Sequence, residues 1–313
     1  MSLQIRVLGS AAGGGYPQWN CNHPNSRRAR RGDAAAPPRT QSSIAVSADG
    51  EHWLLCNASP DLRQQINDNA VLQPKADGPL RASPIQAVVL TNADVDHVTG
   101  LLTLREAQAF NLYATAKVLG VLAANSIFNV LNPALVARHP IALDARFEPL
   151  RPDGASLGLA VTAFAVPGKV ALWLEDAAKG VDIGALGEDT VALEIAALAT
   201  GRRFFYIPGC ARMTDALAAR LRGAPLVFFD GTLWRDDEMI RDGVGVKTGA
   251  RMGHLSVSGD AGTLAAFAEL EVARKIFIHI NTTNPILADD TPERRAVTAA
   301  GWEVAHDGMH VVL

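Results

Sequence analysis

Residues 88–101 read VVLTNADVDHVTGL and carry the pattern that decides the fold of the chain. An apolar run typical of a buried strand ends in a short segment with Asp94, Asp96 and His97. A Leu-rich stretch, typical of a helix, follows Gly100. Carboxylates and imidazoles are ligands for divalent metals, and rigid scaffolds present such groups where strands meet loops. The segment therefore predicts a metal site, and the alternative is a helix start that collects Asp for its dipole.

Three further segments carry the same residue types in similar places. The apolar run IFIHIN contains His279, the run FFDGT ends in Asp230, and the segment MGHL places His254 before a predicted helix. A single strand His is as often a hydrogen-bonded core residue as a metal ligand. Packing alone does not predict three apolar strands that each end in Asp or His, so these residues join the candidate site.

The remaining sequence predicts a mixed α/β chain, because hairpin signals alternate with strand-and-helix units. Asp49 and Gly50 are a strong signal for a tight turn between short strands at 43–47 and 53–56. We expect further strands at 4–8, 85–91, 111–114, 161–166, 191–197, 203–207, 226–230 and 276–280, and helices at 60–70, 100–109, 213–222 and 259–273. Since no linker or repeat interrupts this pattern, residues 1–313 predict a single domain.

A polar segment at 16–40 is rich in Asn, Arg, Pro and Ala, and we expect it to form a mobile loop. It contains four arginines within residues 27–31, and such runs of like charge usually stay solvated. The alternative is that this basic run docks an acidic partner, such as an acidic peptide substrate.

Composition limits the function classes. Hydrophobic residues make up 48% and charged residues 19% of the 313 residues, which predicts a large core. A net charge of −3 argues against nonspecific nucleic-acid binding. The sequence shows neither a signal-peptide pattern nor an apolar run long enough to span a membrane. Three scattered cysteines (Cys21, Cys56 and Cys210) suit a reducing compartment, so we expect a cytoplasmic protein without disulfides.

The spacing of TNADVDH resembles the signature His-x-His-x-Asp-His of the metallo-β-lactamase superfamily. The glycine-rich turn at 9–15, Asp230, His254 and His279 follow in the order found in the phosphodiesterase and tRNA-processing branches of that superfamily. The resemblance implies a four-layer αββα sandwich with a metal site at one edge between two sheets.

The chain departs from that signature at the first of the two metal positions. Asn92 and Asp94 stand where the signature has its first two His residues. The segment 165–169 (AVPGK) lacks the expected later His, and 206–210 (YIPGC) lacks the bridging carboxylate. The resemblance thus implies that one metal position has lost most of its ligands.

The second metal position keeps Asp96, His97 and His279, with Asp94 as a candidate fourth ligand. One carboxylate and two imidazoles with open positions are the ligand type of non-haem Fe(II) oxygenases. A two-metal hydrolase needs both ions to clamp the attacking and leaving oxygens. The loss of one position therefore favours oxygen chemistry over hydrolysis.

Six longer strings resemble the coenzyme PQQ synthesis protein B family: LGSAAGGGYPQWNC, RTQSS, NASPD, VPGKV, IPGCA and HINTTNP. This resemblance implies Fe(II)- and O₂-dependent hydroxylation of a tyrosine-derived precursor of pyrroloquinoline quinone (PQQ), either peptide-borne or a cross-linked Glu-Tyr. Catalytic roles are expected for His254 and Asp94, which would position substrate or move protons, and for Asp230, which would support them. The alternatives are a phosphodiesterase-like metal-dependent hydrolase, and a noncatalytic carrier that transports PQQ toward the periplasm.

Zinc is the other metal that the sequence admits, either substituted for iron or in a structural site. Related proteins often have Cys-x-Cys-x-x-Cys after the first glycine turn, whereas residues 21–26 here read CNHPNS. Cys21 and His23 are the two remaining ligands, and because a stable zinc site wants four, a plain surface loop is the alternative. No other cofactor is expected, and a homo-oligomer is left open.

Overall fold

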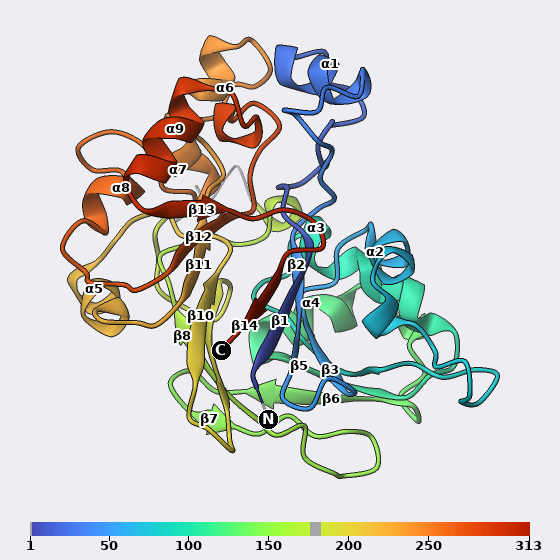
Figure 1. Cartoon of the computed structure of the whole chain (residues 1–313). Helices are drawn as coiled ribbons and strands as arrows, with labels where there is room; N and C mark the ends of the chain where they lie inside the picture. Colours follow the sequence, from blue (N-terminus) through green and yellow to red (C-terminus); the bar gives the residue numbers. More distant parts are fainter. Residues whose placement is uncertain (1, 176–182) are drawn as a thin grey trace.

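Two seven-stranded sheets face each other in this chain, for which a computed structural model describes residues 2–175 and 183–313 (Figure 1). The first sheet has the order β14-β1-β2-β3-β4-β5-β6, with β1 Gln4–Gly9, β2 Ser43–Ser47, β3 Trp53–Cys56, β4 Ile85–Val89, β5 Phe110–Thr115, β6 Val136–Ile141 and β14 His310–Val312. The second has the order β13-β12-β11-β10-β9-β8-β7, with β7 Arg146–Phe147, β8 Leu159–Ala165, β9 Val191–Ala197, β10 Arg203–Ile207, β11 Val227–Asp230, β12 Lys275–Ile278 and β13 Trp302–Val304.

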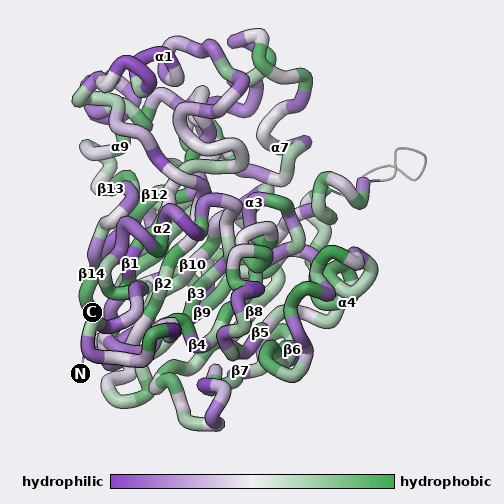
Figure 2. The backbone as a smooth tube through the Cα atoms, turned by 90° about the vertical axis from the view of Figure 1, so that its right-hand side faces the viewer, coloured by the Kyte–Doolittle hydropathy of each residue, from purple (hydrophilic) through white to green (hydrophobic). Residues whose placement is uncertain are grey.

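Helices cover the outer faces of both sheets (Figure 1). The helices of the described residues are α1 Pro24–Arg30, α2 Leu62–Asp68, α3 Val95–Val98, α4 Ala116–Ala124, α5 Asp215–Leu221, α6 Glu238–Arg241, α7 Gly249–Met252, α8 Thr263–Ala266 and α9 Pro292–Ala299. Hydrophobic residues follow the strands, while the segment around α1 is hydrophilic (Figure 2). No helix in the described ranges has the length and apolar character needed to cross a membrane.

Three buried apolar clusters define the layers. One lies between the sheets and includes Val89 and Phe228. A second packs α5 and α9 on the second sheet, and a third packs α2 and α4 on the first. Because each sheet buries one face against the other and one face under helices, its central strands are apolar on both sides. The fold is the four-layer αββα sandwich that the sequence predicted.

The ends of three strands determine where the functional groups gather. Strands β10, β11 and β12 run parallel, so their carboxyl ends share one edge of the second sheet. The end of β4 leads into residues 92–97 at the facing edge of the first sheet (Figure 1). Residues from both halves of the chain therefore meet between the sheets at this edge.

Two expected helices are wrong in extent. In place of a helix at 100–109, α3 starts within the signature segment, and a 3₁₀-helix spans Thr99–Arg105. Gly100 packs so closely on the loop after β3 that an added Cβ would lie 2.2 Å from the carbonyl oxygen of Ser59. In place of a helix at 259–273, only α8 forms, and Gly259 and Glu271, near the two ends of the expected range, have positive φ angles of 93° and 53° that do not fit a helix.

The expected loop at 16–40 contains a helix that the sequence analysis missed. His23 caps α1 and Pro24 occupies its first position, a recognised helix start. The buried Asn25 side chain donates to the carbonyl oxygens of Thr282 and Thr283 at 3.2 and 3.0 Å, which anchors α1 to the loop after β12.

The basic run at 27–31 takes part in contacts within the chain. Arg28 pairs with Asp33 and Asp290, and Arg30 donates to the carbonyl oxygens of Gln18 and Cys21. At least two of its arginines thus stabilise the fold. The three cysteines are free, as the sequence predicted, and all three are buried.

Candidate metal centre

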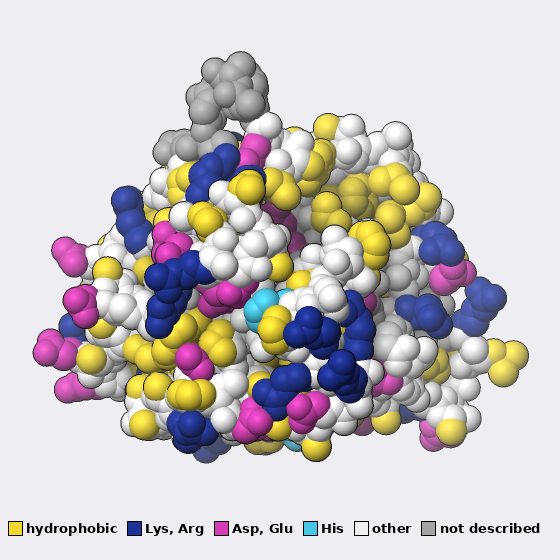
Figure 3. Space-filling model, turned by 90° about the horizontal axis from the view of Figure 1, so that it is seen from above, with side chains coloured by type: hydrophobic (Ala, Val, Ile, Leu, Met, Phe, Trp, Pro, Cys, Tyr) yellow, Lys and Arg dark blue, Asp and Glu magenta, His cyan; other side chains and the backbone are white. Residues whose placement is uncertain are grey.

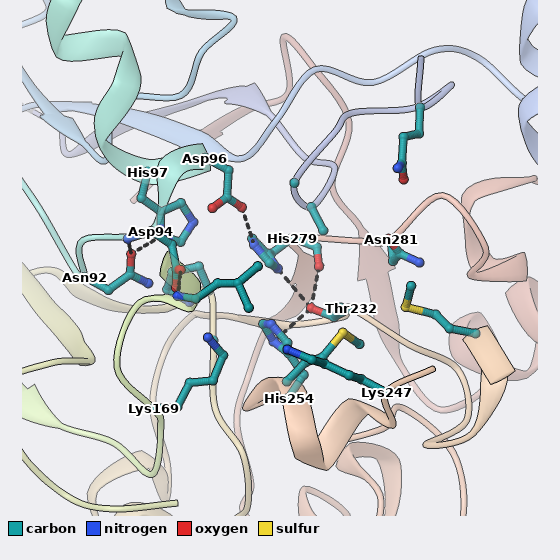
Figure 4. Close-up of a pocket in the computed structure, with 18 residues that line it drawn as sticks. Asn92, Asp94, Asp96, His97, Lys169, Thr232, Lys247, His254, His279 and Asn281 are labelled. Atoms are coloured by element: carbon teal, nitrogen blue, oxygen red, sulfur yellow. Dashed lines mark hydrogen bonds and ion pairs between the residues drawn. The ribbon is translucent and has the colours of Figure 1, made fainter. Parts of the chain in front are cut away.

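A cavity of about 320 Å³ opens at the edge where the strand ends meet (Figure 4). Its walls come from the turn after β1, from residues 92–97 and from the loops that follow β8, β10, β11 and β12. The view onto this edge shows a histidine near the middle of the face, with Lys, Arg and acidic side chains around it (Figure 3). The cavity thus combines imidazole and charged groups at the junction of the two sheets.

Asp96, His97 and His279 come together in this cavity, although His279 lies 183 residues after Asp96. Their potential ligand atoms all lie within 4.8 Å of one another, and His279 Nε2 lies 3.1 Å from Asp96 Oδ2. The two imidazoles meet edge to face, with ring centroids 5.3 Å apart. One carboxylate and two imidazoles therefore converge at a spacing that a single metal ion can bridge.

The ring orientation of His97 is fixed by Asn92, the residue at the first signature position. Asn92 Oδ1 accepts a hydrogen bond from the backbone N–H of Asp94 at 3.0 Å, which identifies this atom as the amide oxygen. His97 Nδ1 lies 2.8 Å from the same oxygen and must therefore carry a proton. Nε2 of His97 is left with its lone pair, which is the form that binds a metal.

Thr232 fixes His279 in the same way. Its hydroxyl lies 2.6 Å from Asp230 Oδ1, which can only accept, so the threonine donates there. The same oxygen lies 2.9 Å from His279 Nδ1 and accepts its proton. Nε2 of His279 then faces Asp96 Oδ2 at 3.1 Å (Figure 4), and a metal would take the place of the proton that the two atoms share.

His279 itself has a left-handed backbone, with φ of 59°, and this conformation ends β12 one residue before it. Non-glycine residues rarely adopt this region, and they do so mainly where the surrounding structure holds them. Here the next residue is held on both sides, because Ile280 N–H donates to Ser10 O and Ile280 O accepts from Ala12 N–H. The expected strand at 276–280 is therefore wrong in its last two residues.

Asp230 is fully buried and accepts four hydrogen bonds. Oδ2 accepts from Cys210 N–H at 2.9 Å and from His254 Nδ1 at 2.7 Å, and Oδ1 accepts from the N–H and hydroxyl of Thr232. His254 stacks on His279 with ring centroids 5.1 Å apart and lines the cavity. Since Nδ1 of His254 is engaged, its Nε2 is the ring nitrogen available to the cavity.

Asp94 lines the cavity beside this group, but it belongs to neither of the two close His/acid clusters in the described residues. Its Oδ1 accepts a hydrogen bond from the N–H of Leu172 at 2.9 Å. The structure thus places Asp94 as a contact between the signature segment and the loop after β8, and its role as a fourth ligand stays a prediction.

The expected zinc ligands Cys21 and His23 lie elsewhere, at the start of α1. His23 Nδ1 accepts from Asn25 N–H at 3.3 Å, and Nε2 lies 3.2 Å from Asp242. Both ring nitrogens therefore have protein partners, and neither residue belongs to a cluster of three close ligands among the described residues.

The electrostatics of the centre differ from residue to residue. Burial opposes ionisation of Asp96, but the neighbouring His97 and His279 hold the pKa of this carboxyl below its usual range. Burial lowers the pKa of His97. Burial also opposes the charge on His279, yet the hydrogen bond with Asp96 raises its pKa. Metal binding would therefore compete with a proton chiefly at His279.

Sequence reasoning missed Thr232, Lys169 and Lys247 as parts of the site. Thr232 follows Asp230 at the end of β11, and a hydroxyl two residues after a strand-end acid was the only signal available. The two lysines line the cavity and extend toward its middle (Figure 4). Their positions depend on loops that no local pattern predicts.

We expect Thr232→Val to weaken metal binding by about ten- to a hundredfold, since partners that orient a ligand His contribute that much. Valine keeps the shape of the side chain but cannot accept the proton of His279 Nδ1. Metal titration of the purified variant measures the change. Thr298→Val on α9 is the matched control, because its hydroxyl donates to Arg294 O within the same helix, away from the cavity. An unchanged affinity in Thr232→Val would show that the hydroxyl does not orient His279.

A buried carboxyl, Glu238, lies behind the cavity wall. It accepts from the hydroxyl of Thr283 at 2.5 Å, and Thr283 accepts from Nδ2 of Asn281, which lines the cavity. Burial and, to a smaller extent, nearby Asp242 raise the pKa of Glu238 to about 7, against the hydrogen bonds from Thr283 and two backbone N–H groups. The Glu238 carboxyl thus changes charge near neutral pH in the folded chain.

Glu238 should make the chain less stable as the pH rises. Its folded pKa of about 7 lies above the ordinary 4.5, so its contribution is fully present below pH 4.5 and is lost as the pH rises to 7. The total loss is about 3 kcal/mol. In Glu238→Gln this slope should disappear, because the amide does not titrate, while its oxygen can still accept the hydrogen bond from the Thr283 hydroxyl. Urea unfolding at several pH values tests this, and parallel curves for both proteins would contradict it.

Comparisons with known proteins agree with this fold. A family model described as Beta-lactamase superfamily domain matches residues 52–280. Coenzyme PQQ synthesis protein B from Gluconacetobacter diazotrophicus is 57% identical over 309 residues, which cover 99% of each chain. The crystal structure of Zn(2+)-bound PqqB from Methylobacterium extorquens has a TM-score of 0.94 at 54% identity and covers 99% of this chain and 100% of that one. A diphosphatase from the PhnP family, at TM-score 0.67 and 20% identity, covers 100% and 98% and shares the fold.

Proposed function

The chain belongs to the coenzyme PQQ synthesis protein B family of the β-lactamase superfamily, and we propose that it is a metalloenzyme of PQQ biosynthesis. Its reaction in this proposal is the Fe(II)- and O₂-dependent hydroxylation of a tyrosine-derived precursor, either peptide-borne or a cross-linked Glu-Tyr. Hydroxylation places one oxygen atom of O₂ in an aromatic C–H bond and reduces the other to water. The two electrons that this requires come from an external reductant.

One observation carries the proposal: the second metal position keeps all three of its signature ligands, whereas the first position has lost most of its own. Asp96, His97 and His279 converge, whereas Asn92 orients a ligand, and Lys169 stands in the segment that lacks the later His. A bound Fe(II) at such a set supplies O₂ activation at open coordination positions. The donor atoms suit it, since Asn92 and Thr232 engage Nδ1 of the two imidazoles, so that Nε2 of each can bind a metal once His279 gives up its proton to it.

The residues around the ligands would position the phenol and manage its protons. His254 is held by Asp230 at 2.7 Å, so its Nε2 can take a proton from the phenol hydroxyl or return one to the product. Asp230 is a buried carboxylate that holds Nδ1 of His254 and so keeps Nε2 of this ring available to the cavity. Asp94, hydrogen-bonded to Leu172 N–H, would hold the cavity wall next to the substrate.

A hydrolase remains the main competing proposal, because a second cluster of Asp230, His254 and His279 also has ligand atoms within 4.8 Å. It shares His279 with the first cluster, and its Asp230 and His254 already bond to each other at 2.7 Å. Two ions would therefore have to share the His279 imidazole, and the second ion would have to disrupt the hydrogen bond between Asp230 and His254. The noncatalytic carrier differs from both, since it requires no turnover.

The test is anaerobic purification with metal analysis, followed by Fe(II) loading and exposure to ¹⁸O-labelled O₂ with the cross-linked Glu-Tyr and a reductant. About one iron per chain and one labelled oxygen in the product, read by mass spectrometry, would support the oxygenase. Two metals per chain with hydrolysis of a phosphodiester would support the hydrolase instead. Tight PQQ binding without oxygen incorporation for any metal would support the carrier.

A further inference from the structure

Lys169 lies in the segment 165–169, in which the sequence resemblance places the missing His ligand of the first metal site. It follows β8 and lines the cavity together with Lys247. In Figure 4 both side chains extend toward the middle of the pocket, near Asp94 and His254. A fixed ammonium thus stands beside the vacated metal position.

The structure holds Lys169 firmly in place. Its carbonyl oxygen accepts from the hydroxyl of Thr190 at 2.9 Å, and its aliphatic stem lies against Gly253, where an added Cβ would be 3.3 Å from Cγ. Gly253 has a positive φ of 88°, so both its backbone and its close contact favour glycine. The side chain of Lys169 is only 10% exposed, which is unusual for lysine.

Among the residues that the structure describes, three positive charges at this wall are paired with one negative charge. Lys169, Lys247 and Arg251 share one carboxylate, Glu175, at 3.4, 3.4 and 3.0 Å among the described residues. Lys169 uses one further donor on its neighbour's carbonyl oxygen, Val170 O, at 3.0 Å. An ammonium has three donors, so one N–H of Lys169 has no partner in these contacts. Burying such a charge is costly without a counter-charge.

We propose that Lys169 and Lys247 form a carboxylate-binding subsite, which holds an acidic group of the substrate while its phenol faces the metal ligands. The inference rests on the proposed function. It adds which part of the tyrosine-derived substrate the two lysines contact, namely a carboxylate close to the phenol ring. The carboxylate of the substrate supplies the missing counter-charge and accepts hydrogen bonds from the ammonium groups of both lysines. Phenols without a carboxylate bind weakly.

Binding to the full-length chain under nitrogen tests the subsite without turnover. The probes are the cross-linked Glu-Tyr and the same compound with every carboxyl group converted to a primary amide. The wild-type chain should bind the acid at least about tenfold more tightly than the amide, since charge-assisted hydrogen bonds contribute that much. Lys169→Met and Lys247→Met, which keep an unbranched stem, should each raise the Kd of the acid about tenfold and leave that of the amide unchanged.

Lys75→Met provides the control, because Lys75 is an exposed lysine that pairs with Glu51 away from the cavity. Equal affinity of the wild-type chain for acid and amide would overturn the subsite. The subsite would also be overturned if Lys169→Met and Lys247→Met each lost the same affinity for the amide as for the acid, because that result would indicate a distorted pocket. Acid-selective binding without oxygen incorporation would contradict only the oxygenase, whereas hydroxylation of acid and amide with equal KM would contradict only the subsite.

Discussion

Replacing His97 with alanine is expected to abolish hydroxylation and to weaken metal binding by more than about a hundredfold. His97 contributes one of only two imidazoles in the converging set, and it is 2% exposed, so water cannot easily replace its nitrogen. Loss of a direct ligand should exceed the effect of losing a partner that only orients one. Metal analysis and single-turnover product formation, measured on the same sample, give the two readouts.

The matched control is His310→Ala, which removes an exposed histidine on β14 outside the cavity. It should keep both its metal and its activity. Full activity in His97→Ala would exclude Asp96, His97 and His279 as the working site. A variant that keeps its metal but loses turnover would instead assign His97 to the substrate.

Asp230→Asn is expected to destabilise the metal-free chain by about 3 kcal/mol, although the two side chains have the same shape. All four groups that contact Asp230 are donors. An amide offers one oxygen and one NH₂ group, so one pair of donors must face another donor in a fully buried position. The unsatisfied groups are Cys210 N–H and His254 Nδ1 in one orientation, or the two donors of Thr232 in the other.

The same substitution should disturb the chemistry, because His254 loses the carboxylate that holds its Nδ1 proton. Urea unfolding measures the stability, and ¹⁵N chemical shifts of the His254 ring report the tautomer. Asp144→Asn serves as the control, since Asp144 is an exposed acid paired with Arg220 and should change stability by less than about 1 kcal/mol. Equal stability of Asp230→Asn and the wild-type chain would contradict the buried four-donor arrangement.

Sequence patterns predicted the layers of the fold well, because apolar strands and strand-end acids are local signals. They failed where one contact between distant segments decides the local structure. Gly100 meets the loop near Ser59, and the resulting crowding coincides with a 3₁₀-helix in place of the expected α-helix. Likewise, α1 forms within an expected loop, and the side chain of Asn25 bonds to the 282–284 backbone.

The candidate ligands could be named from the spacing of the signature, but not the groups that orient them. Asn92 counted as a lost ligand in the sequence, whereas in the structure it fixes the tautomer of His97. Thr232 lies 47 residues from His279, and only the parallel pairing of β11 with β12 makes them neighbours. Hydrogen bonds of this kind depend on three-dimensional packing, so a linear pattern does not contain them.

The separation of the ligands along the chain has a consequence for how the protein is maintained in the cell. Asp96 and His279 come from opposite sheets and are 183 residues apart, so the site exists only after both halves have folded against each other. A metal that binds this site and not the unfolded chain adds RT ln(1 + [M]/Kd) to stability, or about 2.7 kcal/mol at a hundredfold excess over Kd. Metal supply would then set not only the activity of this protein but also the fraction of its molecules that escapes proteolysis.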